Sequence, residues 1–481
     1  GDGYSDVAVG APMGSNGESQ EGLVYVYYGS NTGISTVPGI VLQSNQVNAN
    51  FGYSVSTAGD VNGDGYSDLM VGAQTWESAI AEDREGGVFI YHGSATGITS
   101  TPAIILQVNS TLVYMGFSVS CAGDINNDGY SDVIAGAPYA SFPSTQEGAA
   151  YVFLGSASGV TATPHKRLER NQASAQFGVS VAGIGDVNGD NYSDIAVGAF
   201  AWDISVAGAD DGIACIWYGS ATGLGALANP APNVTLNATG YGTYCGWSVG
   251  GAGDVNGDGY SDFITGDWRG NNGGPTQEGT ALVFHGSAAG LSAVPAIMYE
   301  GNQLNQLYGR SVGTAGDVNG DGYADIIVGA VTAGYGQALE GAAYVYLGSP
   351  TGTSATYLYR YEANIAGANM GECARTAGDV NGDGYSDMIV GLKLNGIGGT
   401  ASVFHGGPYN VTTAPTSTRY SGNAGARLGA ASANAGDING DGYSDAVFGA
   451  PDGSNGQALE GLVYVHYGSS AGLSIAPNLT L

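Results

Sequence analysis

Short apolar segments alternate with glycine- and aspartate-rich stretches along the whole chain. In one unit, residues 51–55 alternate between apolar and small polar positions, which is typical of a half-buried strand. Residues 69–73, 87–91 and 103–106 are short apolar runs bounded by turn residues, and they predict three further strands. No stretch combines a 3.6-residue period with helix caps, so the pattern predicts an all-β protein without helices of consequence.

One nine-residue segment punctuates this pattern at regular intervals. It runs Asp60-Val-Asn-Gly-Asp-Gly-Tyr-Ser-Asp68, and related copies begin at Asp124, Asp186, Asp254, Asp317, Asp379 and Asp437. A truncated copy, from Gly1 to Asp6, opens the chain. The sequence therefore contains eight units, of which the first lacks its beginning.

Four strands per unit of about 60 residues indicate a β-propeller. A solenoid would need a shorter period, and separate sandwiches would need about 100 residues each. We expect about eight four-stranded antiparallel blades, the first without its innermost strand. Seven blades remain an alternative, because residues 1–42 align without gaps to residues 440–481. The expected single propeller spans residues 1–481, with an incomplete blade at 1–50 and blades at 51–114, 115–176, 177–244, 245–307, 308–369, 370–427 and 428–481.

Composition narrows the range of functions. The chain has 85 glycines in 481 residues and a net charge of −31, from 11 basic and 42 acidic residues. Such an excess of acid excludes nucleic-acid binding and argues against docking on anionic membranes. No apolar run approaches the length of a membrane span, so we expect no membrane insertion in this segment.

The repeated loops carry the most specific chemistry. Each places oxygen donors at its first, third, fifth, seventh and ninth positions, the seventh through a backbone carbonyl, on a tightly curled backbone. Hard cations such as calcium need such a cluster, whereas zinc and iron prefer the His or Cys that the loops lack. The eight loops hold 23 of the 42 acids, and eight calcium ions would halve the net charge. We expect about eight structural Ca²⁺ ions, held by Asp2, Asp6, Asp60, Asn62, Asp64, Tyr66, Asp68, Asp124, Asn126, Asp128, Tyr130, Asp132, Asp186, Asn188, Asp190, Tyr192, Asp194, Asp254, Asn256, Asp258, Tyr260, Asp262, Asp317, Asn319, Asp321, Tyr323, Asp325, Asp379, Asn381, Asp383, Tyr385, Asp387, Asp437, Asn439, Asp441, Tyr443 and Asp445.

Two further elements recur in a fixed order around these loops. A Phe-Gly element stands at Phe51-Gly52 and Phe177-Gly178, and a Gly-Ala-Pro element begins at Gly10, Gly136 and Gly449. With the loops, these units resemble FG-GAP repeats, the blades of integrin alpha-chain propellers and of many bacterial secreted proteins. The resemblance implies a secreted or cell-surface, calcium-loaded propeller that binds its ligand on the face away from calcium.

The second-to-third-strand connections are the most variable, and the propeller topology places them opposite the Asp loops. Variable loops on a rigid scaffold often carry binding residues. Trp76, Trp202, Trp268 and Arg269 lie in these connections and are candidates for contact with a protein or glycan. The alternative interpretation is that each tryptophan folds back and plugs its own loop.

No nucleophile, phosphate-loop or zinc motif is present, so we expect a non-catalytic adhesion or ligand-binding scaffold. Two alternatives remain. The chain could be a self-assembling subunit of a glycosylated filament or surface layer, in which a neighbouring copy or a longer chain supplies the missing strand. It could also be an enzyme acting on polysaccharides, because some similar propellers belong to polysaccharide lyases. Candidate glycosylation sites are Asn109, Asn233, Asn237, Asn410 and Asn478. The four cysteines leave their pairing open.

Overall fold

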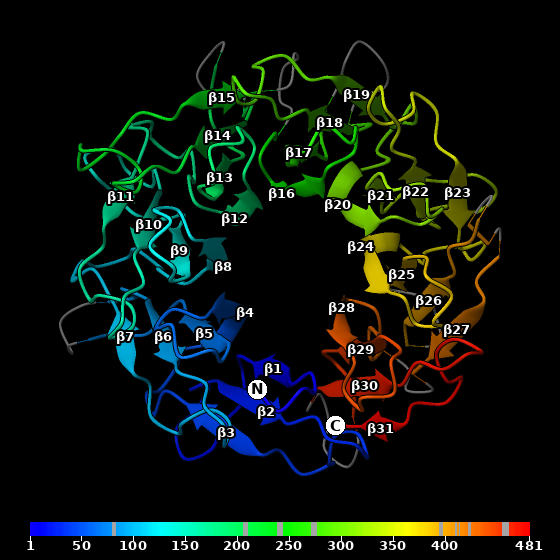
Figure 1. Cartoon of the computed structure of the whole chain (residues 1–481), viewed down its shortest axis with the longest axis horizontal. Helices are drawn as coiled ribbons and strands as arrows, with labels where there is room; N and C mark the ends of the chain where they lie inside the picture. The colour runs from blue at the N-terminus through cyan, green and yellow to red at the C-terminus, as the bar shows by residue number, and fades with distance from the viewer. Residues whose placement is uncertain are drawn as a thin grey trace.

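The computed structural model describes residues 1–78, 83–204, 210–237, 244–270, 277–393, 398–408, 411–412, 414–421, 425–454 and 461–481. These residues form eight antiparallel sheets arranged as blades around a central axis (Figure 1). No helix occurs among them, and none of them belongs to a helix that could span a membrane.

The strands follow one another from the inside of the ring outward in each blade. In chain order the sheets contain β1 (Val7–Ala11), β2 (Leu23–Tyr27) and β3 (Ile40–Gln43); β4 (Phe51–Gly59), β5 (Asp68–Ala73), β6 (Gly87–Tyr91) and β7 (Ile104–Leu106); β8 (Ser118–Gly123), β9 (Asp132–Ala137), β10 (Ala149–Phe153) and β11 (Lys166–Leu168); β12 (Ser180–Gly185), β13 (Asp194–Ala199), β14 (Ile213–Trp217) and β15 (Val234–Leu236); β16 (Ser248–Gly253), β17 (Asp262–Asp267), β18 (Thr280–Phe284) and β19 (Ile297–Glu300); β20 (Tyr308–Gly316), β21 (Asp325–Ala330), β22 (Ala342–Tyr346) and β23 (Tyr359–Glu362); β24 (Met370–Gly378), β25 (Asp387–Leu392), β26 (Thr400–Phe404) and β27 (Ser417–Tyr420); and β28 (Ala431–Gly436), β29 (Asp445–Ala450), β30 (Leu462–His466) and β31 (Leu479–Thr480).

The predicted all-β fold of eight blades is confirmed, and the strands of the second blade lie close to where the pattern placed them. The main difference is β4, which continues beyond residue 55 to Gly59. The pairing of β4 with β5 shifts register between Thr57 and Gly59. This bulge adds twist at the end of the strand and directs the chain into the Asp loop.

The hydrophobic core lies between neighbouring blades. Second strands such as β9 and third strands such as β10 are buried along their whole length, since each has a blade on both faces. One core cluster, for example, joins Ile134 and Val152 of the third blade to Val197 and Cys215 of the fourth. A single blade could not bury both faces of its sheet, so stacking in a ring supplies most of the apolar burial.

Hydrogen bonds between the last and first blades close the ring. Ser5 N donates to Asp437 O at 2.9 Å, and Ser30 N donates to Ile438 O at 3.1 Å. The same connection joins the second and third blades, where Ser131 N donates to Asp60 O at 2.9 Å. The contact between the two ends of the chain therefore repeats the ordinary contact between neighbouring blades.

The first sheet has three strands in the described part of the chain, as the truncated first unit predicted. β1 pairs with β2 alone, and Gly10 on β1 is exposed, whereas the equivalent Gly72 and Gly136 are buried. All four cysteines, Cys121, Cys215, Cys245 and Cys373, are free thiols.

Candidate metal loops and the opposite rim

The Asp loops connect the first and second strands of the blades, so they all lie on one face of the ring. In the second blade, Asp60 Oδ1 accepts hydrogen bonds from the N–H groups of Gly63 and Asp64 at 2.7 and 3.1 Å. Its Oδ2 accepts a third from Gly65 at 2.8 Å. Gly65 has a φ of 88°, a conformation that a residue with a side chain rarely adopts. The first aspartate thus curls the loop around its own carboxylate.

The ninth aspartate clamps the base of the loop. Asp132 is fully buried; its Oδ2 accepts from Ile125 N at 2.9 Å, and its Oδ1 accepts from Gly155 N at 2.8 Å. Gly155 follows the third strand, so one carboxylate ties the loop to a more distant turn of the same blade. Asp68, Asp194, Asp262, Asp325, Asp387 and Asp445 make the equivalent pair of bonds.

This environment raises the pKa of the ninth aspartate. Burial, with smaller contributions from the carboxylates of Asp124 and Asp128, raises the pKa of Asp132 to about 7, although the hydrogen bonds from Gly155 and Ile125 act to lower it. The pKa is raised to about 7 for the same reasons at Asp194, Asp262, Asp325 and Asp387, and to about 6 at Asp445. A cation among these carboxylates would favour their charged form and reverse this effect.

The donor chemistry of the loops fits a hard cation, although the side chains are not gathered around one point. Within the described ranges, no group of three or more His, Cys, Asp or Glu side chains is placed to hold a metal ion. The loop carboxylates bond to backbone N–H groups instead; Asp64 Oδ1, for example, accepts from Tyr66 N at 3.0 Å. Carboxylate oxygens have more than one lone pair, so such an oxygen can also contact a cation. Oxygen-only donors on a curled loop suit calcium.

Neighbouring loops also contact one another around the ring. A Cβ atom built on Gly63 would lie 2.6 Å from a ring carbon of Tyr130, the seventh residue of the next loop. Tyr4 of the first blade covers Gly440 of the last in the same way, with 2.5 Å to the built atom. The loop tyrosines therefore pack against the preceding loops, in addition to offering a carbonyl oxygen.

The four candidate ligand-binding residues divide into two groups. Trp76 packs at the edge of a core cluster, with its ring 5.6 Å from that of Phe89, and Trp202 packs against another cluster. Both lie three residues after the second strand of their blades, and both are partly buried against the core. Trp268 lies only one residue after β17, and it contacts the next blade instead.

Trp268 and Arg269 belong to a group of stacked aromatic and arginine side chains, which we call the rim cluster. Its members are Phe200, Tyr244, Trp247, Trp268, Arg269 and Arg310. The guanidinium carbon of Arg269 lies 4.9 Å from the Trp268 ring centroid, and that of Arg310 lies 5.4 Å from it. Arg269 Nη1 also donates to Tyr244 Oη at 2.6 Å. Trp268 Nε1 and Arg269 Nε are buried and have no hydrogen-bond partner among the described residues.

Sequence reasoning missed four of the six members of this cluster, although a repeat position marks two of them. Trp247, Arg310 and Glu372 each follow the second residue of the Phe-Gly element, near the start of an innermost strand and opposite the Asp loops. Glu372 extends the cluster by contacts with Arg310 at 3.9 Å and with Lys393 at 3.0 Å. Aligning the units at that position would have shown an aromatic, cationic and acidic series along the rim.

The candidate glycosylation sites differ in exposure. Asn109, Asn233 and Asn478 are exposed and Asn237 is half-buried, whereas Asn410 lies outside the described residues. Asn233 Oδ1 accepts from Tyr218 N at 2.9 Å, and Asn478 Oδ1 accepts from Tyr467 N at 2.8 Å. These two side chains therefore also have a structural role at the end of the third strand.

The fold and the repeated loops define an eight-bladed β-propeller that contains FG-GAP repeats. The FG-GAP repeat family matches residues 1–27, 51–91 and 116–153, and the FG-GAP-like repeat family matches residues 317–390.

Curated proteins similar to this chain are integrin alpha subunits. Integrin alpha-5 of Xenopus laevis is 32% identical over 212 residues, which cover 43% of this chain and 19% of that protein. Integrin alpha-V of Gallus gallus is 33% identical over 215 residues, with 43% and 19% covered. Integrin alpha-7 of Homo sapiens is 33% identical over 169 residues, with 34% and 13% covered. The chain thus spans at most about a fifth of the length of these relatives.

Proposed function

We propose that this protein is an extracellular, calcium-stabilised propeller that binds a protein ligand at the rim cluster and does no chemistry on it. The observation that carries the proposal is the stacking of Arg269 and Arg310 on Trp268, next to Tyr244 and Trp247. Trp, Tyr and Arg dominate the binding energy of protein interfaces. The similarity to integrin alpha chains and the position opposite the Asp loops support the same face.

Charge also favours this rim. The chain has only 11 basic residues against 42 acidic ones, yet Arg269, Arg310 and Lys393 lie together here. Glu372 neutralises part of this charge through its contacts with Arg310 and Lys393. Arg269 has no carboxylate contact among the described residues, so an acidic side chain of the ligand would form an ion pair with Arg269.

Calcium has a structural role in the proposal. In each complete loop the first, third, fifth and ninth side chains and the seventh carbonyl would hold one ion, which would offset the repulsion of three carboxylates. Chelation by EGTA is expected to lower the thermal midpoint, because an ion that binds the folded state stabilises it by about 2.7 kcal/mol per site at 100 times its Kd. An unchanged midpoint in EGTA would contradict the structural role.

Ligand binding is tested with the full chain, calcium and a panel of purified extracellular matrix proteins and immobilised glycans. We expect Trp268→Ala to weaken capture of a matrix protein about thirtyfold, as for an interface residue worth about 2 kcal/mol. Arg375→Ala is the charge control, because Arg375 is an exposed arginine outside the rim cluster. Capture that is equal in Trp268→Ala and the unmodified protein would refute the rim site. Self-assembly and action on polysaccharides, the two alternatives from the sequence, stay predictions.

A further inference from the structure

A cavity of about 520 Å³ lies on the outer flank of the ring, between the fifth and sixth blades. One wall is the outermost strand β19 with Tyr299 and Glu300, and the other comes from β22, β23 and the loops of the next blade. We call it the tyrosine cleft, because Tyr299, Tyr335, Tyr344, Tyr346 and Tyr357 line it. Its size is within the range of about 300–1,000 Å³ that small-molecule sites occupy.

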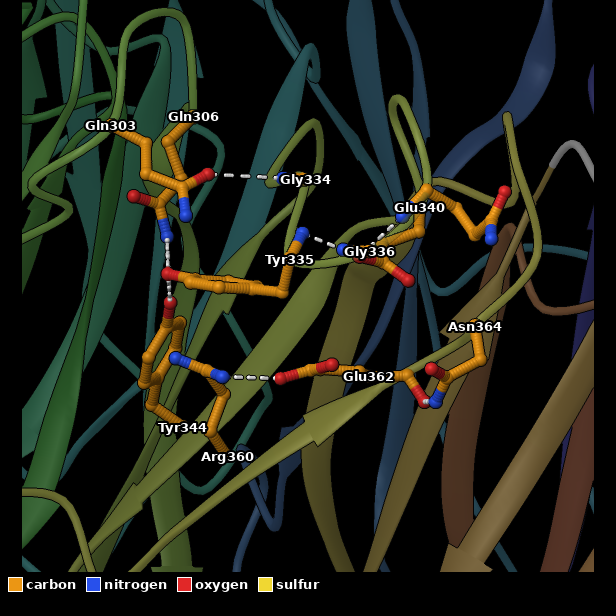
Figure 2. A network of polar contacts seen from close by, with 11 residues as sticks. Gln303, Gln306, Gly334, Tyr335, Gly336, Glu340, Tyr344, Arg360, Glu362 and Asn364 are labelled. Carbon is orange, nitrogen blue, oxygen red and sulfur yellow. Dashed lines mark hydrogen bonds and ion pairs between the residues drawn. The ribbon is translucent and has the colours of Figure 1, made fainter.

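A hydrogen-bond network fixes two of the tyrosines (Figure 2). Gln306 is fully buried, and its Nε2 donates to Tyr335 Oη at 2.8 Å and to Tyr344 Oη at 2.6 Å. The two hydroxyls also bond to each other, which uses one of their two protons. No further acceptor is present for the second proton among the described contacts of these residues. The cleft therefore offers one phenol O–H to a ligand acceptor.

The loop that carries Tyr335 is held from behind. Glu340, which is fully buried, accepts hydrogen bonds from the N–H groups of Tyr335, of Gly336 at 2.8 Å and of Gln337 at 3.2 Å. Gly334 N donates to Gln303 Oε1 at 3.1 Å, which joins this loop to the preceding blade (Figure 2). The walls of the cleft are thus positioned before any ligand arrives, and such preorganisation lowers the cost of binding.

The charges of the cleft narrow the ligand class. The guanidinium carbon of Arg360 lies 3.5 Å from the Tyr335 ring centroid, and Arg360 Nε donates to Glu362 at 2.7 Å (Figure 2). A cationic ligand would need an accessible aromatic ring face, but Arg360 already covers the face of Tyr335 and would repel a second positive charge. A ligand anion would meet Glu300 in a chain of net charge −31. Both signs of charge are disfavoured, so a neutral ligand fits best.

The same chain contains a related joint without the extra hydroxyls. Between the second and third blades, Arg167 stacks 4.4 Å from the Phe142 ring centroid and pairs with Glu169 at 2.9 Å, as Arg360 does with Tyr335 and Glu362. At the positions of Tyr299, Tyr346 and Tyr357 this joint has Leu106, Phe153 and Pro164. The arginine stack therefore serves the fold in both joints. The packing of two neighbouring blades therefore does not require tyrosine at these three positions.

We propose that the tyrosine cleft binds a neutral oligosaccharide. The C–H face of a sugar ring would stack on Tyr357, which is 44% exposed at the mouth of the cleft. Sugar hydroxyls would bond to the phenol O–H of Tyr335 or Tyr344 and to the side chains of Glu300 and Gln303. The site is separate from the rim cluster, so it adds a second binding surface on the flank of the propeller.

The test is isothermal titration of the full chain, with calcium present, against chitotriose, cellotriose and mannotriose. We expect at least one of these neutral trisaccharides to bind, and Tyr357→Ala to weaken it about tenfold or more. Tyr357 is 44% exposed, so its replacement is expected to retain the fold, as an unchanged thermal midpoint would show. Pro164→Ala, at the equivalent position of the related joint, is the matched control and should leave the affinity unchanged.

Each other outcome overturns the inference. Binding of none of the three sugars, or equal affinity in Tyr357→Ala, would exclude the cleft as their site. Tighter binding of trigalacturonate or of the cationic glucosamine trimer would refute the argument from charge. If Trp268→Ala loses sugar binding and Tyr357→Ala keeps it, the sugar binds at the rim cluster. The inference about the cleft then fails, while the proposal for the rim cluster stands.

Discussion

Replacing Asp132 by Asn separates the two roles assigned to the ninth loop position, backbone clamp and calcium ligand. The Asp132 carboxylate is fully buried and accepts N–H bonds from Ile125 and Gly155. An asparagine keeps one acceptor oxygen and turns an NH₂ group towards the other N–H. The substitution therefore removes one hydrogen bond and one negative charge without a large change in volume.

The size of each effect follows from the contacts. A hydrogen bond to a charged group contributes about 1.5–3 kcal/mol, but Asp132→Asn also removes a buried negative charge that the raised pKa shows to be unfavourable in the folded state, so without calcium the two effects oppose each other and we expect little net change in stability. With calcium at 100 times its Kd, loss of one ion costs about 2.7 kcal/mol more. Measurements belong at pH 8, above the pKa of about 7 that burial gives Asp132 in the metal-free protein, so that the parent carboxylate is ionised.

The assay combines calcium titration by calorimetry with thermal unfolding in calcium and in EGTA. We expect the stoichiometry to fall by about one ion and the calcium-dependent rise of the midpoint to be smaller in Asp132→Asn. Asp83→Asn is the matched control, because Asp83 is an exposed acid outside the loops. An unchanged stoichiometry with the same calcium-dependent rise would show that Asp132 holds no ion and serves only as a clamp.

Three further predictions concern buried polar side chains. Arg419 is 2% exposed, and its Nη1 has no partner among the described residues. The equivalent position is leucine in the first four blades, so Arg419→Leu is expected to raise the free energy of unfolding by about 1–4 kcal/mol. A lower thermal midpoint in this variant would instead indicate that a counterion pairs with Arg419. Burial, with a smaller contribution from Arg419, lowers the pKa of His466 to about 4, so the unfolded chain binds more protons than the folded chain between about pH 4 and 6.5. Stability is therefore lost as the pH falls through that window, by roughly 3 kcal/mol in total. His466→Phe should make the free energy of unfolding less dependent on pH in this window, and an unchanged pH dependence would contradict the reasoning. Glu340→Gln should weaken the hydrogen bonds that hold the loop at Tyr335 and lower the free energy of unfolding in urea by about 1–3 kcal/mol. Amide hydrogen exchange should become faster in that loop alone. Exchange rates in the loop equal to those of the unmodified protein would show that other contacts hold it.

The rim and the cleft show where sequence reasoning stops. The spacing of the loops predicted eight blades and a first blade of three strands, because each unit carries its own strands and turns. Trp76, Trp202 and Trp268 looked equivalent in the sequence. Trp268 lies two residues closer to the preceding strand than the other two, and only the structure shows the effect of this difference. That difference directs Trp268 to Arg310 in the next blade and leaves Trp76 against Phe89 in its own.

Local pattern, then, was determined by the sequence alone: the strands, the curled acidic loops with their oxygen donors, and the repeat that stacks them. These depend on residues within one unit, where alternation, glycine and aspartate act over a few positions. Contacts between units were decided by the tertiary structure, among them Ser5 with Asp437, and Tyr299 beside Tyr346. Such pairs come from different blades, and only the closing of the ring, driven by burial of both faces of the sheets, brings them together.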